Sequence, residues 1–408
     1  MQQNFNAEEK DALSQIIYLV GDGLQIMNMP NLSSRIPFDE DVVSFLSVLS
    51  KELMQSTEAK AYPDVVTFGF WIRAASLLQL EEKFGFHDNL IHLGNGTVFH
   101  IAPSNVPVNF AYSLVVGLLM GNANIVRIPS RDFPQVNIIV RAIKKVLSEH
   151  EVIKPYISLI RYGRERQIND VLSAMADVRV IWGGDATIKE IRKSPLSPRS
   201  TEITFADRFS IAVIDSDVYL QSGDKERIAL NFYNDTYLSD QNACTSPRLV
   251  VWIGSRKEEA KFKFWELLHE LVRDKYNFQS IMSVNKLTSA YLMAAHEQGT
   301  EIIPSEDNLL VRVRVPKANK NIIDFRDNSG YFFEYDCDDL RDLWELCNEK
   351  RIQTIGLLGD SAMLRPLILS GVKGIDRIVP IGKTMNFDFL WDGYNLAERL
   401  TRTVTNYR

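Results

Sequence analysis

One cysteine, Cys244, lies in the polar stretch SDQNACTSPRLVVW, residues 239–252, directly before an apolar and β-branched run. A thiolate attacks activated carbonyls such as thioesters, and the resulting acyl-cysteine can accept a hydride or pass its acyl group to another acceptor. A cysteine in a loop can equally be an inert packing residue. Cys244 is therefore a candidate nucleophile, and its role depends on what the rest of the chain supplies.

The other cysteines and the histidines give Cys244 no partner along the sequence. Cys337 and Cys347 lie in or near the helix-like stretch DLRDLWELCNEK, residues 339–350, where packing is the better interpretation. The cysteines have no CxxC spacing and the histidines no metal-ligand spacing, so we expect neither a disulfide framework nor a metal site. With no histidine near Cys244 in sequence, a papain-like hydrolase is disfavoured.

Composition narrows the class of protein. The chain has 408 residues, 45% hydrophobic and 24% charged, which is typical of a globular protein of two or three domains. Its formal net charge is −6 and its basic residues are scattered, which argues against nucleic acid as a partner. Acidic residues precede the first apolar run and no apolar run is long enough to span a bilayer. We therefore expect a cytoplasmic protein with reduced thiols and no membrane span.

Strand-like and helix-like segments alternate from residue 97 onward. Such elements would form the sheet that holds the loop of Cys244 in place. The clearest helical segment is residues 134–150, where apolar residues recur at i, i+3 and i+4 spacing. This alternation predicts βαβ units and a parallel sheet, at whose carboxyl edge a nucleotide would bind. The strand-like runs are TVFHIAP (97–103), NIVRIPS (124–130), ISLIRYG (157–163) and VRVIWGG (178–184).

Conventional nucleotide fingerprints are missing, since neither GxGxxG nor GxxxxGK[ST] occurs. In their place stand HIAPSNVPVNFAYSLVVGLLMGNANIVRIPSRD (100–132), VIWGGDATIKEI (180–191), the cysteine loop and GVKGIDRIVPIGKTMNFDFLWDGYNL (371–396). These stretches resemble the acyl-CoA reductase family, the fatty acid reductase component of bacterial luminescence systems and a branch of the aldehyde dehydrogenase superfamily. The likeness runs from about residue 90 to the C-terminus.

The resemblance implies an α/β fold like that of aldehyde dehydrogenases. Such a fold has a modified Rossmann domain, which binds its dinucleotide without the fingerprint, and a second α/β catalytic domain. The cofactor that the resemblance implies is NADPH. A second α/β rhythm between residues 211 and 375 fits this division, whereas residues 1–90 read as helical without a chemical motif. We expect three parts: the helical segment with the dinucleotide-binding domain (1–208), the catalytic domain (209–375) and a tail returning to the first domain (376–408).

The resemblance also implies roles for single residues. Asn105 corresponds to an asparagine whose side-chain amide helps hold an oxyanion, although an asparagine between two prolines also suits a turn or a helix N-cap. The cofactor-binding residues that the resemblance implies are Arg127, Pro129 and Ser130 at the ribose, and Gly183, Gly184 and Asp185 at the phosphates. Ser130 and Asp185 could instead cap helices, and the two glycines could serve a turn.

Two departures from the superfamily pattern concern a cation and a carboxylate. Aldehyde dehydrogenases usually carry a lysine where this chain has Ile128, and Arg127 precedes it by one position, which in a strand means the opposite face. The superfamily's general-base glutamate has its nearest equivalent in Glu202, within RSTEITFADRF (199–209), which lacks the usual glycines. Glu202 is the predicted acid or base.

The expected activity is the NADPH-dependent reduction of an acyl thioester, either fatty acyl-CoA or an acyl-protein, to the aldehyde through acylated Cys244. Both tetrahedral species carry an oxyanion, for which the Asn105 side chain and the Cys244 backbone N–H are candidate donors. A cysteine acyltransferase or thioesterase without hydride transfer is the alternative, and an inactive scaffold that binds a synthetase-type partner is a third. The expected partners include an acyl-protein synthetase and further copies of this chain.

Overall fold

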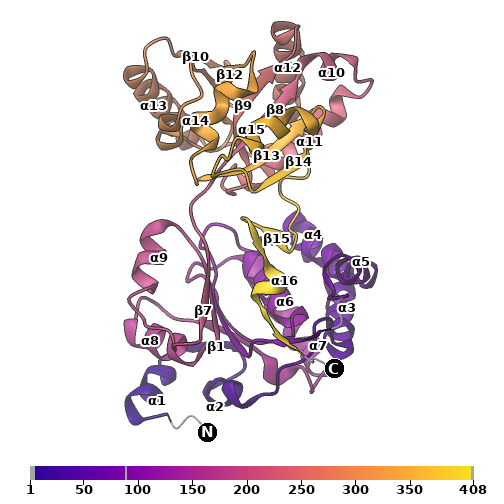
Figure 1. The fold of residues 1–408 in the computed structure, drawn as a ribbon, viewed down its shortest axis with the longest axis vertical. Coiled ribbons are helices and arrows are strands. Elements are labelled where there is room, and N and C mark those ends of the chain that lie inside the picture. Colours follow the sequence, from indigo (N-terminus) through magenta and orange to yellow (C-terminus); the bar gives the residue numbers. More distant parts are fainter. Residues whose placement is uncertain (1–4, 88–89, 406–408) are drawn as a thin grey trace. The chain divides into compact units, whose positions relative to one another are not determined.

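The chain folds as two compact units in a computed structural model that describes residues 5–87 and 90–405 (Figure 1). The first unit comprises Met1–Ala206 with Tyr394–Arg408, and the second comprises Asp207–Gly393. The expected tail is therefore divided: residues 376–393 fold with the second unit, and the remainder returns to the first. In the part of the chain that the structure describes, no helix has both the length and the apolar character needed to cross a membrane.

A six-stranded sheet of order β1-β5-β4-β3-β6-β7 forms the centre of the first unit. All neighbouring strands are parallel except β1, which pairs antiparallel with β5. β3 and β6 are buried along their whole length, as expected of parallel strands covered on both faces. The strands are β1 (Ile17–Val20), β3 (Thr97–Ile101), β4 (Ala123–Arg127), β5 (Ile157–Arg161), β6 (Val178–Trp182) and β7 (Thr201–Phe205).

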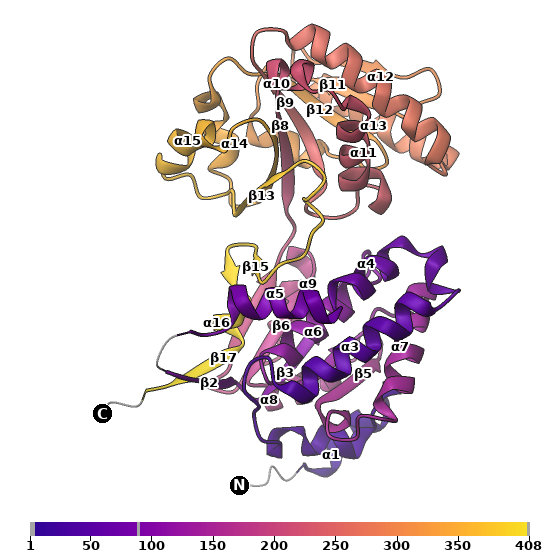
Figure 2. The same ribbon diagram turned by 90° about the vertical axis from the view of Figure 1, so that its right-hand side faces the viewer.

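Helices cover both faces of this sheet. In Figure 1, α8 and α9 lie on one side of the sheet and α3 and α7 on the other, and Figure 2 shows α3 and α7 side by side. The apolar stripe predicted within residues 134–150 is the buried face of α7. The helices are α1 (Ala7–Ser14), α2 (Gly23–Asn28), α3 (Glu40–Gln55), α4 (Pro63–Trp71), α5 (Ala74–Phe84), α6 (Asn109–Leu119), α7 (Pro134–Leu147), α8 (Arg166–Met175) and α9 (Asp185–Ile191).

The C-terminal segment returns to the first unit as a strand. β17 (Thr401–Val404) pairs antiparallel with β2 (Ile91–Gly94), after the short α16 (Leu396–Arg399). The buried Asn122 side chain donates to the Leu400 carbonyl at 2.9 Å and thereby fixes this end of the chain. The short strands β15 (Leu390–Trp391) and β16 (Tyr394–Asn395) form a two-stranded sheet just before it.

A seven-stranded sheet of order β10-β11-β12-β9-β8-β13-β14 forms the second unit, parallel except for the pair β10 and β11. On one face of this sheet, a hydrophobic core packs against α11 and α12. On the other face, a second hydrophobic core packs against α13, α14 and α15. Cys337 and Cys347 lie buried in this second core, where packing was expected. The strands are β8 (Phe209–Asp215), β9 (Pro247–Ile253), β10 (Glu301–Pro304), β11 (Val311–Arg314), β12 (Tyr331–Asp336), β13 (Ile352–Leu358) and β14 (Arg377–Pro380). The helices are α10 (Ser216–Gln221), α11 (Lys225–Thr236), α12 (Lys257–Lys275), α13 (Ser280–His296), α14 (Trp344–Cys347) and α15 (Arg365–Leu369).

Candidate active site

Cys244 lies in the loop that leads into β9 of the second unit, and it is partly exposed. The loop turns at Asp240 and Gln241, which have φ angles of +50° and +57°. The buried Gln241 side chain donates to the Pro247 and Tyr331 carbonyls at 3.0 and 2.9 Å. The Ser210 hydroxyl on β8 donates to the Cys244 carbonyl at 2.7 Å. The backbone around the sulfur is therefore fixed by buried hydrogen bonds to two neighbouring strands.

The surroundings of the sulfur favour the protonated thiol. Burial raises the pKa of the Cys244 thiol to about 12, and the negative charge of Asp392 acts in the same direction. Arg248 and a hydrogen bond from the Gln353 side chain act in the opposite direction, and lower the pKa of the thiol. At neutral pH the resting sulfur carries its proton, so nucleophilic attack requires a group that takes this proton away.

Two residues that the sequence interpretation missed, Gln353 and Asp392, act on the pKa of the Cys244 thiol. Gln353 on β13 is fully buried, and its side-chain amide donates to Asp392 Oδ1. Asp392 Oδ2 lies 3.8 Å from Arg208 Nε. Asp392 belongs to the quoted stretch 371–396, but only as part of an Asp-Gly turn. The Asp-Gly pair indicates a turn in the sequence, but nothing in the sequence indicates that the Asp392 carboxylate is buried.

The cofactor residues predicted near the ribose meet at the carboxyl edge of the first unit's sheet. Arg127 ends β4, donates to the Gly163 carbonyl and places its guanidinium 4.3 Å from the centre of the Tyr162 ring. The Ser130 hydroxyl donates to the Tyr162 carbonyl at 3.5 Å. The structure therefore brings Arg127 and Ser130 together against the segment after β5, with Pro129 between them in sequence.

The predicted phosphate loop follows β6 and begins α9. The Gly183 N–H donates to the Phe205 carbonyl at 3.1 Å, which fixes the start of the loop. Gly184 precedes Asp185 with φ of −66°, and a Cβ atom at Gly184 would meet nothing within 4 Å. Packing therefore does not require glycine at this position, and the open space beside it suits a ligand that approaches the backbone closely.

A buried chain of hydrogen bonds supports the start of this loop. Trp182 stacks on Phe205 with 3.7 Å between ring centres, and its indole N–H donates to Ser113 Oγ at 3.0 Å. His100 continues the chain, with Nδ1 2.7 Å from Ser113 Oγ and Nε2 3.0 Å from Asn124 Oδ1. Because Asn124 Oδ1 can only accept, His100 carries its proton on Nε2 and Nδ1 accepts from Ser113. Burial lowers the pKa of His100 to about 4, so the imidazole is neutral.

The remaining predicted residues, Asn105 and Glu202, both lie in the first unit, whereas Cys244 lies in the second. Asn105 is exposed in the loop between β3 and α6. Glu202 on β7 uses both carboxylate oxygens in ion pairs: Oε2 accepts from Arg179 Nε at 2.9 Å, and Oε1 accepts from Arg192 Nε at 2.7 Å. Its role as acid or base stays a prediction.

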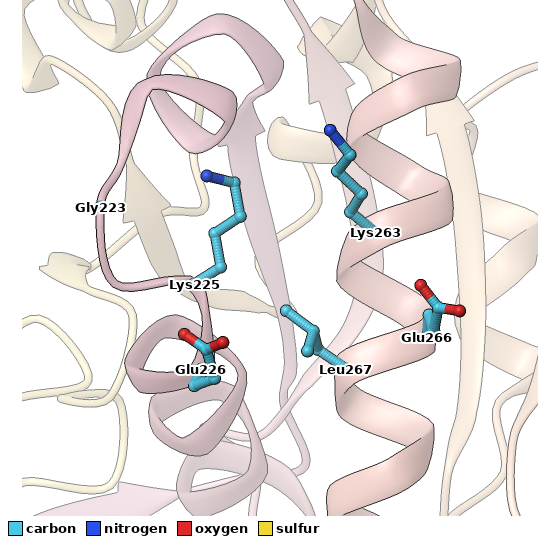
Figure 3. A pocket seen from close by; sticks show the side chains of 6 residues that line it. All are labelled: Gly223, Lys225, Glu226, Lys263, Glu266 and Leu267. Atoms are coloured by element: carbon cyan, nitrogen blue, oxygen red, sulfur yellow. The ribbon is translucent and has the colours of Figure 1, made fainter.

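A surface pocket in the second unit is lined mainly by charged side chains (Figure 3). The Lys225 and Lys263 side chains extend toward the same end of this pocket, and Glu226 and Glu266 lie below them. Lys225 donates to the Ser222 carbonyl and Lys263 pairs with Glu259. Its lining contains none of the predicted site residues and no cysteine.

The fold is that of the aldehyde dehydrogenases. Betaine aldehyde dehydrogenase from Staphylococcus aureus matches with a TM-score of 0.64 at 13% identity, over 93% of this chain and 86% of its own. Lactaldehyde dehydrogenase from Escherichia coli matches with a TM-score of 0.62 at 13% identity, over 95% of each chain. The predicted fold class is confirmed.

Within that class, sequence comparison singles out one branch. The family model described as Acyl-CoA reductase (LuxC) matches residues 84–275, which include Cys244 and all the other predicted site residues. Long-chain acyl-protein thioester reductases from Photorhabdus luminescens and Vibrio harveyi are each 24% identical, over 322 and 327 residues, or 77% of this chain. The chain spans 64% of the length of these relatives. The resemblance to the acyl-CoA reductase family is confirmed.

Proposed function

We propose that the chain reduces an acyl thioester to the aldehyde with NADPH, through an acyl group carried on Cys244. The observation that carries this proposal is the position of Cys244: a partly exposed thiol, on a backbone fixed by Gln241 and Ser210, within the segment that matches the acyl-CoA reductase model. The name of the relatives, long-chain acyl-protein thioester reductase, supports a thioester of a long acyl chain as the substrate.

Acylation is the first step of the proposed reaction. The Cys244 S–H bond breaks, the sulfur attacks the thioester carbonyl carbon and a tetrahedral oxyanion forms. The proposed donors to this oxyanion are the Asn105 side-chain amide and the Cys244 backbone N–H. When the oxyanion collapses, the substrate's C–S bond breaks, and its thiol leaves with a proton. The acyl group then remains on Cys244 as a new thioester.

Reduction is the second step. When bound, NADPH supplies the hydride that converts this acyl thioester into a thiohemiacetal oxyanion. The same two donors stabilise that oxyanion, and its collapse breaks the bond to the Cys244 sulfur and releases the aldehyde. Arg127, Pro129 and Ser130 are proposed to hold the ribose end of NADPH. Gly183, Gly184 and Asp185 are proposed to hold its phosphates, a role that the open space at Gly184 supports.

A kinetic experiment tests this proposal. Purified protein is mixed with NADPH and acyl-CoAs of graded chain length, and with an acylated protein as a second donor, while NADPH absorbance and thiol release are followed. We expect acyl-dependent loss of NADPH that disappears in Cys244→Ala, with the best chain length identifying the substrate. In Asn105→Ala we expect kcat to fall about 100- to 1,000-fold, since one oxyanion donor is lost.

The matched control is Cys347→Ala, which removes a cysteine buried in the core of the second unit and should keep NADPH turnover. Thiol release that requires Cys244 while NADPH stays constant would replace the proposal by an acyltransferase or thioesterase. If neither acyl donor gives a signal, addition of an acyl-protein synthetase distinguishes a partner-dependent enzyme from an inactive scaffold.

A further inference from the structure

The segment between β14 and β15, residues 381–389, lies against the loop that carries Cys244. The Thr245 hydroxyl donates to Met385 Sδ at 3.2 Å, and the Ser246 hydroxyl lies 3.9 Å from the same sulfur. Thr245 directly follows Cys244 in the chain, and consecutive Cα atoms are only about 3.8 Å apart. The Met385 side chain is therefore in contact with the residue next to the nucleophile.

Hydrogen bonds within the second unit hold this segment in place. Asp235 at the end of α11 is only 1% exposed, and it accepts from the Gly382 N–H at 2.6 Å and from the Thr384 N–H at 3.1 Å. Arg377 on β14 donates to the Thr384 carbonyl at 3.3 Å and to the Asn386 carbonyl at 3.0 Å. Because these four hydrogen bonds go to backbone groups, the course of the segment does not rest on its partly exposed apolar side chains.

Two apolar side chains of the segment are partly exposed, Met385 and Phe387. Phe387 packs on Trp391 with 4.9 Å between ring centres, and the Arg377 guanidinium lies 4.3 Å from the centre of the same Trp391 ring. Methionine offers an unbranched, adaptable side chain, and phenylalanine offers a large, rigid apolar face. Side chains of these two kinds suit contact with an alkyl chain, whose affinity comes from the removal of apolar surface from water.

We propose that Met385 and Phe387 form the surface against which the acyl chain of the substrate lies while its carbonyl carbon reacts at Cys244. The inference rests on the proposed function and deepens it, because it names the acyl groups that the site prefers. Each CH2 group that is buried on binding is worth about fourfold in affinity. The surface therefore favours long alkyl chains over short ones.

Alkylation of Cys244 measures this surface without any hydride transfer. The protein is treated at about pH 8 with iodoacetamide or with its N-octyl derivative, and mass spectrometry of peptides locates the alkylated cysteine. We expect the N-octyl reagent to alkylate Cys244 at least about tenfold faster, since burial of two CH2 groups is enough for this factor. Cys337 and Cys347 are buried and serve as internal references, because they should react with neither reagent while the protein is folded.

Substitutions in the segment should change the ratio of the two alkylation rates. Met385→Ser and Phe387→Ser each remove apolar surface and should lower this ratio to less than about threefold. Met385→Leu removes the sulfur that accepts from Thr245 but keeps an apolar side chain of similar volume, so it should recover the ratio. Leu369→Ser is the matched control, because Leu369 is an apolar residue of α15 that is 71% exposed and lies outside the segment. The melting temperature shows that each variant is folded, and the two serine variants are independent of each other.

Reduction of acyl-CoAs gives a second readout. In Met385→Ser and Phe387→Ser we expect KM to rise at least about tenfold more for tetradecanoyl-CoA than for butanoyl-CoA. In Leu369→Ser the two KM values should change by the same factor. A displaced nucleophile loop would instead lower kcat for both substrates alike, because Cys244 reacts with each of them.

The outcomes separate the acyl surface from the proposed function. Equal rates of Cys244 alkylation by the two reagents in the wild-type protein would overturn the acyl surface, even if reduction with NADPH is established. A ratio of rates that stays unchanged in both Met385→Ser and Phe387→Ser, or that falls equally in Leu369→Ser, would overturn it as well. A ratio that depends on Met385, in a protein that reduces no acyl thioester, would contradict the proposed reduction and support the same surface for an acyl-transfer reaction.

Discussion

The properties of Cys244 come from side chains that are distant in sequence. Gln241 fixes the backbone of its loop, and Gln353, on another strand of the same sheet, lowers the pKa of the thiol. Burial and the negative charge of Asp392 raise the pKa of the thiol, so the protonated form is favoured. A protonated thiol is less reactive toward oxidants and electrophiles than a thiolate, so these surroundings make the resting sulfur unreactive.

Glu202 shows how a carboxylate of the expected type can serve the fold instead. Arg179 and Glu202 are direct partners on the parallel strands β6 and β7, and the Arg179 side chain is only 3% exposed. Arg179 also donates to Ser173 Oγ at 2.9 Å and to the Ser194 carbonyl at 2.7 Å. Glu202 therefore neutralises a buried guanidinium that ties β6 to α8 and to the segment after α9.

Glu202→Gln should lower stability more than catalysis. Removal of the carboxylate charge leaves Arg179 buried without its counterion, which we expect to cost roughly 1–3 kcal/mol of unfolding free energy. Thermal unfolding and NADPH turnover of the same preparation measure the two effects, and kcat should be retained below the melting temperature. Glu190→Gln is the control, since Glu190 pairs with the exposed Lys193 and such surface pairs contribute little to stability. A hundredfold loss of kcat at unchanged stability would instead support the predicted acid or base.

At the level of elements, periodicity predicted the strands that carry the first unit. β3, β5 and β6 lie within the predicted runs at 97–103, 157–163 and 178–184. These runs could be predicted because parallel strands that are buried on both faces are rich in β-branched residues. β1 was not predicted within the helical-looking residues 1–90. Its four residues are mostly exposed or half-buried, and an edge strand of this length has no distinctive pattern.

The side-chain pairings could not be read from the sequence in the same way. Gln353 and Asp392 are 39 residues apart, and a helix and strand β14 intervene between them. The Arg179–Glu202 pair depends on the register of β6 against β7, which hydrophobic periodicity does not determine. Motif resemblance predicted roles for the cysteine and the glycine loop, since each lies in a contiguous stretch of sequence, but it could not locate groups that only the tertiary fold brings together.

Gly184→Ala tests the phosphate loop as an element. An alanine is compatible with φ of −66° and its Cβ would meet no atom within 4 Å, so the melting temperature should stay unchanged. A bound phosphate in that space would be displaced, and we expect the Kd for NADPH to rise at least about tenfold, or about 1.4 kcal/mol. Fluorescence titration measures this. Gly223→Ala is the matched control, because a Cβ atom at Gly223 would likewise meet nothing within 4 Å but would lie in the second unit. Equal Kd values for the two variants would contradict a phosphate site at Gly184.

At the level of the whole molecule, the chain enters and leaves the second unit at neighbouring points. Asp207 begins this unit and Gly393 ends it, and the adjacent residues Arg208 and Asp392 form an ion pair within it. A domain inserted into another in this way commonly has its ends close together.

NADPH should stabilise the whole protein independently of the cysteine. A ligand that binds only the folded state at 100 times its Kd adds about 2.7 kcal/mol, which for a chain of this size corresponds to a rise of several degrees in melting temperature. We expect NADPH to give a larger shift than NADH at equal concentration, because the resemblance to acyl-CoA reductases implies the phosphorylated cofactor. Cys244→Ala should keep this shift while it abolishes turnover, since the predicted cofactor residues lie in the first unit and Cys244 in the second. A shift with NADH alone would reverse the cofactor preference. The absence of a shift with either nucleotide, in protein that is still acylated at Cys244, would leave acyl transfer without a reductant as the chemistry that the nucleophile performs.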